Sequence, residues 1–252
     1  SSAEKRRRLA AALASEEHAA AVITLADSIA WLFNVRGADL VYSPVTLGFA
    51  ILRNDATADL FVDPEKADAA VRAHLGNEVT VRPRADFPAA LDALGGDEAH
   101  VLADPGTAPA YVYDRLESAG ATVVRGVDPC QLSKACKNDT ELEGIRTAHV
   151  RDGATLTRLL RWLGRESPKG TITELDVSAR SDELRRAGRL CTGLSFPAIT
   201  GAGPNGAIVH YRVSEATNRT LKAGELFLLD SGGQYLDGTT DVTRTIAVGE
   251  PG

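Results

Sequence analysis

The pattern of hydrophobic and polar positions in the first half of the chain alternates short apolar runs with amphipathic segments. Residues 4–17 carry apolar positions at helical spacing, and residues 20–24 form a continuous apolar run typical of a buried strand. Asp27 is a candidate N-cap for a helix that continues through Phe33. Further strands are predicted at residues 45–53, 59–62, 78–81, 100–103 and 121–125, and further helices at 86–94 and 107–118. This alternation predicts an α/β domain with a mixed or mostly parallel sheet.

The pattern changes in the second half of the chain. Asn138 is a candidate N-cap for one long helix that ends near Gly164, and a second helix ends near Gly188. The remainder, residues 195–248, is rich in glycine and in strand-forming residues. We therefore predict two domains, residues 1–128 and 129–252.

Composition narrows the classes of protein that fit. The 252 residues include 28 Lys and Arg against 34 Asp and Glu, a net charge of −6 that argues against binding to nucleic acid. No uninterrupted run of about 18 apolar residues is present, so membrane insertion is not expected. Three cysteines without zinc-site spacing, and no leader pattern, indicate a cytoplasmic protein with reduced thiols. The sequence contains no methionine, which suggests a piece of a longer protein.

Candidate chemistry is concentrated in one segment near the end of the chain. Asp230 follows the apolar run 226–229, which reads as a strand buried on both faces. A hairpin turning near Tyr235 and Leu236 would place Asp230 opposite Asp241 on the neighbouring strand. Two carboxylates brought together repel each other and lose hydration, and a divalent cation would relieve both costs. Oxygen ligands favour Mn, Mg or Ca, with Zn or Co as alternatives.

Spacing alone leaves a second interpretation of this segment open. The Asp-Ser-Gly-Gly sequence that begins at Asp230 and the Asp-Gly sequence that begins at Asp237 are ordinary turn sequences. Pairs of aspartates at arbitrary spacing are also common. The spacing is therefore compatible with either a metal site or a plain turn.

The residues of this segment resemble a known family. Residues 229–232 (LDSG) and 237–245 (DGTTDVTRT) are similar to the first metal-ligand segment of the pita-bread metallopeptidases, in particular the long, three-domain Xaa-Pro aminopeptidases (aminopeptidase P). Residues 199–211 (ITGAGPNGAIVHY) are similar to the segment before the first ligand, and residues 27–37 (DSIAWLFNVRG) resemble the second of the family's N-terminal domains. The resemblance implies a creatinase-N-like α/β domain with a mixed sheet, followed by the first half of an α+β pita-bread catalytic domain.

The same resemblance implies an activity and a set of site residues. The family removes an N-terminal residue that precedes proline, by means of a hydroxide shared between two divalent metal ions. We expect Mn, with Zn or Co as alternatives, peptide substrates with penultimate proline, and a homodimer when the protein is intact. Carried over to this chain, Asp230 is a ligand to one ion, Asp241 bridges both ions, and His210 lies beside the scissile peptide as a hydrogen-bond donor.

The resemblance also implies that part of the metal site is missing from this sequence. The family uses a histidine and two glutamates further along the catalytic domain. No histidine follows Asp241, and Glu250 is the only acid that does. We therefore expect this chain alone to supply two of five ligands and to be inactive as a peptidase.

Alternatives remain for the residues and for the function. His210 is otherwise a satisfied histidine beside a β-bulge. Thr243, two residues beyond Asp241 on the same strand face, either supports a ligand carboxylate or is a plain surface threonine. For the function, the rivals are a homologue without metal ligands that binds proteins or peptides, and a creatinase-like hydrolase. Retention of Asp230 and Asp241 favours the peptidase over both.

Overall fold

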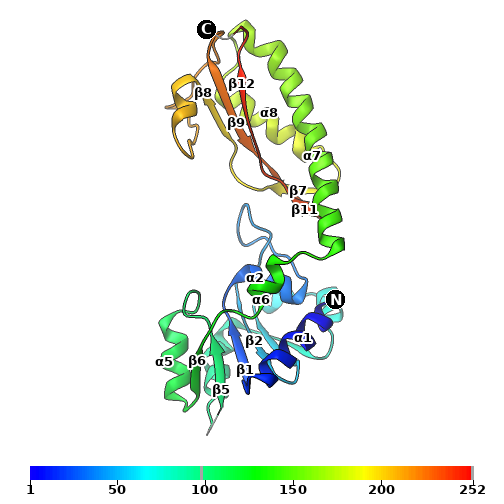
Figure 1. Cartoon of the computed structure of the whole chain (residues 1–252), viewed down its shortest axis with the longest axis vertical. Coiled ribbons are helices and arrows are strands. Elements are labelled where there is room, and N and C mark those ends of the chain that lie inside the picture. The colour runs from blue at the N-terminus through cyan, green and yellow to red at the C-terminus, as the bar shows by residue number, and fades with distance from the viewer. Residues whose placement is uncertain (97–98, 251–252) are drawn as a thin grey trace. The chain divides into compact units, whose positions relative to one another are not determined.

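The computed structural model describes residues 1–96 and 99–250, which form two compact units (Figure 1). Unit 1 is Ser1–Cys136 and unit 2 is Lys137–Gly252. Unit 1 is built on a six-stranded mixed sheet of order β4-β3-β2-β1-β5-β6, in which β1 pairs antiparallel with β2 and parallel with β5. Its strands are β1 (Ala20–Ile23), β2 (Phe49–Arg53), β3 (Ala58–Phe61), β4 (Val79–Arg82), β5 (His100–Ala103) and β6 (Thr122–Arg125).

Helices cover both faces of this sheet. Successive side chains of β1 point to opposite faces, so β1 contributes residues to the core on each side. Ala21 and Ile23 pack in a core with α1 (Ser2–Ser15), α2 (Ala26–Phe33), α3 (Ala69–Leu75) and α6 (Cys130–Ala135). Ala20 and Val22 pack in a second core with α4 (Phe87–Asp92) and α5 (Ala110–Ser118). All four residues of β1 are buried, which explains the apolar run that predicted it. The predicted α/β unit with a mixed sheet is confirmed.

Local details of unit 1 differ from the sequence predictions. The N-cap of α2 is Leu25, and Asp27 lies within the first turn, so the predicted capping role of Asp27 is wrong. The Asp27 carboxylate still lies near the positive end of the helix dipole, where an acid is stabilising. The short helices α3 and α6 were not predicted from the sequence.

Helix α6 belongs to unit 1. Cys130 is fully buried in the same core as α2, and the Lys134 ammonium bonds to Asp27 and to the Ser28 hydroxyl. The two units divide after this helix, between Cys136 and Lys137, whereas the boundary that we predicted at residue 128 precedes it.

Unit 2 begins with two helices whose first turns are fixed by capping boxes. Asn138 and Glu141 cap α7 (Asp139–Glu166), and Thr173 and Asp176 cap α8 (Glu174–Arg186), close to the predicted positions. Although α7 has 28 residues, no helix within residues 1–96 and 99–250 is long and apolar enough to cross a membrane.

The strands of unit 2 form two three-stranded sheets, of order β12-β9-β8 and β11-β10-β7. Phe227 and Leu229 on β9 pack against α7 and α8, while Leu226 is 56% exposed. Burial therefore alternates along β9, and our prediction that this strand is buried on both faces is wrong. An apolar run does not distinguish burial on one face from burial on two. The strands are β7 (Cys191–Leu194), β8 (Ile199–Ala202), β9 (Leu226–Ser231), β10 (Gly233–Tyr235), β11 (Gly238–Thr239) and β12 (Val242–Ala247).

The chain passes from one sheet to the other at Gly232. A Cβ atom on Gly232 would lie 1.9 Å from the Thr240 carbonyl oxygen, so only glycine permits this crossing. The predicted turn between Tyr235 and Gly238 is present, but it joins β10 to β11 in the second sheet. Consequently Asp230 is paired with Thr243 rather than with Asp241, and the predicted cross-strand pairing of the two aspartates is wrong.

Because unit 1 contains two cores of its own, we expect residues 1–136 to unfold cooperatively as an isolated fragment. Removal of α6 exposes the core around Cys130, so the fragment 1–128 should be less stable by about 1–3 kcal/mol. Urea titrations followed by circular dichroism measure both transitions. Equal stability of the two fragments would show that α6 is not part of this unit.

Candidate functional site

The three residues that the sequence singled out meet in one cleft of unit 2. His210, Asp230 and Asp241 line a cavity of about 410 Å³. Asp230 projects from the end of β9, Asp241 immediately precedes β12, and His210 lies on the long connection between η4 (Gly203–Ala207) and β9. The other residues that line the cleft are Phe196, Pro197, Ile199 and Arg212, none of which was predicted.

The carboxyl groups of Asp230 and Asp241 lie close to each other in this cleft, which both residues line. Burial raises the pKa of Asp241, and the charge of Asp230 and the hydrogen bond with it raise this pKa further. Thr243 Oγ1 donates a hydrogen bond to Asp230 Oδ1 at 2.8 Å. This contact is the first of the two alternatives that the sequence left open for Thr243, support of a ligand carboxylate. Two neighbouring carboxylates with hard oxygen donors fit a divalent cation, because the cation removes their mutual repulsion.

The donor set is nevertheless small. No group of three or more His, Cys, Asp or Glu side chains that could hold a metal ion occurs in the described part of the chain. Asp230 and Asp241 therefore fit as two ligands of a metal centre, and further ligands would be needed to complete it.

The segment that carries His210 is held in place by a buried residue next to His210. His210 itself is exposed and has φ of 54°, a left-handed backbone conformation that is uncommon for a residue other than glycine. The next residue, Tyr211, is buried, and its hydroxyl donates to Glu174 Oε2 at 2.9 Å. The backbone of the connecting segment is thus fixed immediately beside His210.

Glu174, the first residue of α8, is the acceptor at the centre of this anchor and was missed by the sequence analysis. Its side chain is fully buried, and it accepts hydrogen bonds from the Ala202 amide (2.7 Å), the Asn205 side chain (3.0 Å) and the Arg219 amide (3.1 Å). The positive end of the helix dipole also favours a carboxylate at this position. In a sequence, an acid in the first turn of a helix indicates only that it stabilises the helix end. The role of Glu174 as a buried acceptor therefore has no signal in the sequence.

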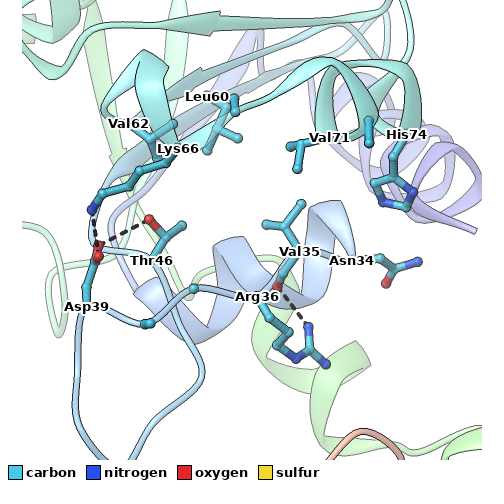
Figure 2. Close-up of a pocket in the computed structure, with 14 residues that line it drawn as sticks. Asn34, Val35, Arg36, Asp39, Thr46, Leu60, Val62, Lys66, Val71 and His74 are labelled. Carbon is cyan, nitrogen blue, oxygen red and sulfur yellow. Dashed lines mark hydrogen bonds and ion pairs between the residues drawn. The ribbon is translucent and has the colours of Figure 1, made fainter. Parts of the chain in front are cut away.

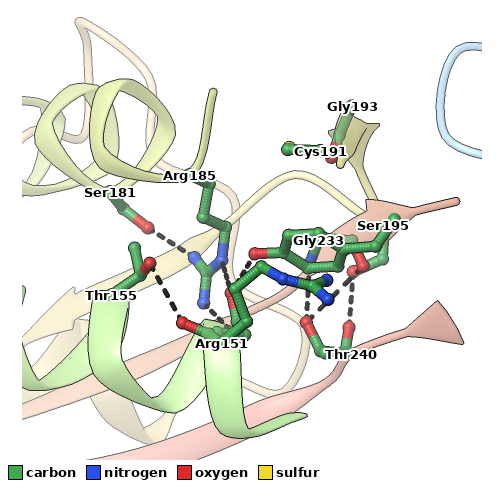
Figure 3. Close-up of polar contacts among 11 residues, drawn as sticks. Arg151, Thr155, Ser181, Arg185, Cys191, Gly193, Ser195, Gly233 and Thr240 are labelled. Carbon is green, nitrogen blue, oxygen red and sulfur yellow. Dashed lines mark hydrogen bonds and ion pairs between the residues drawn. The ribbon is translucent and has the colours of Figure 1, made fainter. Parts of the chain in front are cut away.

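A second buried network supports the β10–β11 hairpin, which precedes Asp241 (Figure 3). Arg185 and Asp152, which are 2% and 3% exposed, form an ion pair with Nε to Oδ1 at 2.8 Å. The Tyr235 hydroxyl donates to Asp152 at 2.7 Å, and the Thr240 hydroxyl accepts from the Gly233 amide at 3.0 Å. These contacts tie the β10–β11 hairpin to helices α7 and α8.

Electrostatics within this network favour an ionised Asp152. Burial would raise the pKa of its carboxyl. Hydrogen bonds and charge from Arg185, with further hydrogen bonds from Tyr235 and Thr240, outweigh burial and hold the pKa of Asp152 below its usual value.

A larger pocket of about 670 Å³ lies within unit 1, where Figure 2 shows Val35 and Val71 pointing into it. The polar groups on its rim bond to neighbouring parts of the chain. Arg36 donates to the Val35 carbonyl at 2.9 Å, and His74 Nε2 lies 3.0 Å from the Phe33 carbonyl oxygen at the end of α2. The His74 contact lies at the C-terminal end of α2, where backbone carbonyl groups have no partner within the helix.

Comparison with known families agrees with this division into units. Residues 1–141 match the creatinase/prolidase N-terminal domain, and residues 143–252 match metallopeptidase family M24. The chain belongs to the family of proteins with a creatinase/prolidase N-terminal domain, and its second unit is similar to metallopeptidase family M24. The predicted fold class, a creatinase-N-like domain followed by part of a pita-bread domain, is thereby confirmed.

Curated relatives include probable Xaa-Pro aminopeptidases P from Paracoccidioides brasiliensis and Aspergillus niger. Each is 39% identical to this chain over 98% of its length. The match covers 42% of each relative, so the chain spans less than half the length of the proteins that it resembles.

Solved structures show the same relationship. An X-prolyl aminopeptidase from Caenorhabditis elegans, described as a cytosolic enzyme with a dinuclear active site, is 32% identical and superposes with a TM-score of 0.90. The match covers the whole of this chain and 42% of that one. A Xaa-Pro dipeptidase from Bacillus anthracis, at 21% identity and a TM-score of 0.76, shares the fold.

We expect substitution of Asp152 by Asn to destabilise unit 2 by about 3–5 kcal/mol at pH 7, because it leaves Arg185 buried without a counter-charge. A lowered pKa means that the ionised carboxylate stabilises the fold above the pKa of unfolded aspartate, about 3.9, and that this contribution is lost as the pH falls below it. The difference from the wild type should therefore shrink at pH 3.

Urea titrations of the 252-residue chain at both pH values measure this difference. Asp139→Asn, at an exposed position on the same helix, is the matched control and should change the free energy of unfolding by less than about 1 kcal/mol. An equal loss for Asp152→Asn at pH 7 and pH 3 would contradict the assigned charge state.

Proposed function

We propose that the protein is a dimetal-dependent aminopeptidase that removes the N-terminal residue from peptides with proline in the second position. The observation that carries the proposal is that the Asp230 and Asp241 carboxyl groups lie close together in a cleft that also contains His210. Similarity to the M24 family and the names of the relatives support the same activity. A homologue that acts only in recognition would have no need to keep two repelling carboxylates together.

Asp230 and Asp241 are proposed to hold two divalent ions, Asp241 as the bridge between them. We propose Mn, with Zn or Co as alternatives. When bound, such ions act as Lewis acids and lower the pKa of water enough to supply a nucleophile near neutral pH. Thr243 holds the Asp230 carboxylate through its 2.8 Å hydrogen bond, so that the two carboxylates keep one orientation.

His210 is proposed to donate a hydrogen bond to the carbonyl oxygen of the scissile peptide and to the negative charge that develops on it. Its exposed ring lies in the same cleft as the two carboxylates, and Tyr211 beside it is fixed to Glu174. A left-handed backbone at a residue other than glycine is a strained feature that persists only where its surroundings impose it.

Phe196, Pro197 and Ile199 give the cleft an apolar side. We propose that this side contacts apolar parts of the peptide, including the proline ring, and displaces water from the reacting bond. For the intact protein we further propose a homodimer in the cytoplasm.

We expect the full-length protein to hydrolyse Xaa-Pro peptides only when divalent metal is present. Removal of metal with a chelator should abolish hydrolysis, and Mn should restore it. Asp241→Ala should reduce kcat more than Asp230→Ala, because loss of a bridging ligand affects both ions. Hydrolysis by the fully metal-depleted protein would contradict the proposal.

Metal content measured on the same two variants tests the assigned roles separately from activity. Asp241→Ala should retain fewer ions per chain than Asp230→Ala. Equal metal content in the two variants would contradict the bridging role of Asp241.

A further inference from the structure

Arg212 is the one side chain of positive formal charge among the residues that line the cleft, and the proposed mechanism does not use it. It is exposed, and it makes no hydrogen bond or ion pair within residues 1–96 and 99–250. Several other arginines of unit 2 have acidic partners: Arg151 with Asp237, Arg180 with Glu183, Arg185 with Asp152 and Arg219 with Glu225. Arg212 therefore presents an unused cation to the cleft.

The backbone at Arg212 is held in place although its side chain has no partner. Tyr211 lies between His210 and Arg212, is buried, and donates its hydroxyl proton to Glu174 Oε2 at 2.9 Å. Tyr211 is buried, whereas the residues on either side of it, His210 and Arg212, both line the cleft. The position of the Arg212 backbone relative to His210 is thus restricted by the fold.

A guanidinium is planar and carries five N–H donors that match the two oxygens of a carboxylate. Neither Asp230 nor Asp241 forms an ion pair with Arg212 in the part of the chain that the structure describes. A carboxylate brought by the substrate is a partner that matches this cation in charge and in hydrogen-bonding geometry.

We propose that Arg212 binds a carboxylate of the peptide substrate and so determines specificity for peptides with a negative charge close to the scissile bond. This inference rests on the proposed function. Consecutive residues are at most about 3.6 Å apart along an extended chain, so the backbones of Arg212 and His210 are separated by about 7 Å or less. The recognised carboxylate then lies within about three residues of the bond beside His210. It is either an acidic side chain after the proline or the terminal carboxylate of a short peptide.

Pairs of peptides that differ in one charge distinguish these two sources. The first pair is Ala-Pro-Glu-Ala amide and Ala-Pro-Gln-Ala amide, which are nearly the same size. The second pair is Ala-Pro-Ala with a free carboxylate and the same peptide as the amide. We expect the full-length, Mn-loaded protein to favour the charged member of at least one pair by about two- to ten-fold in kcat/KM, mainly through KM. This preference should decline as salt is added.

Substitution at Arg212 should change the preference in a graded way. Arg212→Ala should bring the ratio of kcat/KM within the pair close to one, and Arg212→Lys should retain part of it. Arg212→Glu should reverse the preference toward Ala-Pro-Lys-Ala amide. Arg158→Ala, which removes the same charge from an exposed position on α7, is the matched control and should leave every ratio unchanged.

The outcomes separate this inference from the proposed function. If the wild type hydrolyses Xaa-Pro peptides but Arg212→Ala discriminates within both pairs as the wild type does, the role of Arg212 is overturned while the proposed function stands. The same holds if the wild type shows no charge preference. If the wild type hydrolyses none of the peptides, both are overturned.

Discussion

The repulsion between two carboxylates held close together is the constraint that the fold around the cleft of unit 2 has to oppose. Left to themselves, Asp230 and Asp241 would separate and hydrate. Three features of the fold oppose this separation: the hydrogen bond from Thr243, the pairing of β9 with β12, and the crossing at Gly232. The cleft is thus preorganised to bind a cation. The surrounding structure offsets the free-energy cost of holding the two carboxylates together.

The rest of unit 2 stabilises the surroundings of this pair through buried polar groups. Asp152 and Arg185 tie the hairpin next to Asp241 to the two helices. Glu174 fixes the irregular segment that carries His210, because it accepts a hydrogen bond from the Tyr211 hydroxyl. In each case a buried charge is satisfied by several hydrogen bonds, because an unsatisfied one would be costly. These networks fix the positions of side chains that irregular segments alone would leave mobile.

Sequence patterns predicted the features that depend on local chemistry. The capping residues of α7, the buried strand β1 and the alternation of strands and helices in unit 1 each have a local signal, and the structure agrees with them. Asp230, Asp241 and His210 were identified by family resemblance. The structure brings them into one cleft, and their roles remain proposals.

Features that depend on tertiary contacts had no such signal. The register that pairs Asp230 with Thr243 follows from a change of sheet at Gly232, and the sequence around this glycine is that of an ordinary turn. Glu174 reads as a simple capping acid although it is fully buried. Arg212 lies on an irregular connection without periodicity, so its place in the cleft could not be predicted.

The stability of the 252-residue chain with and without Mn is the most direct test of the claim that the two carboxylates form a cation site. Without metal at pH 7, Asp241→Asn should raise the free energy of unfolding by up to about 1 kcal/mol, because it removes the repulsion between the two carboxylates. Millimolar Mn should stabilise the wild type and not the variant, since only the pair binds the ion. A variant that is less stable than the metal-free wild type, or that Mn stabilises equally, would contradict this account.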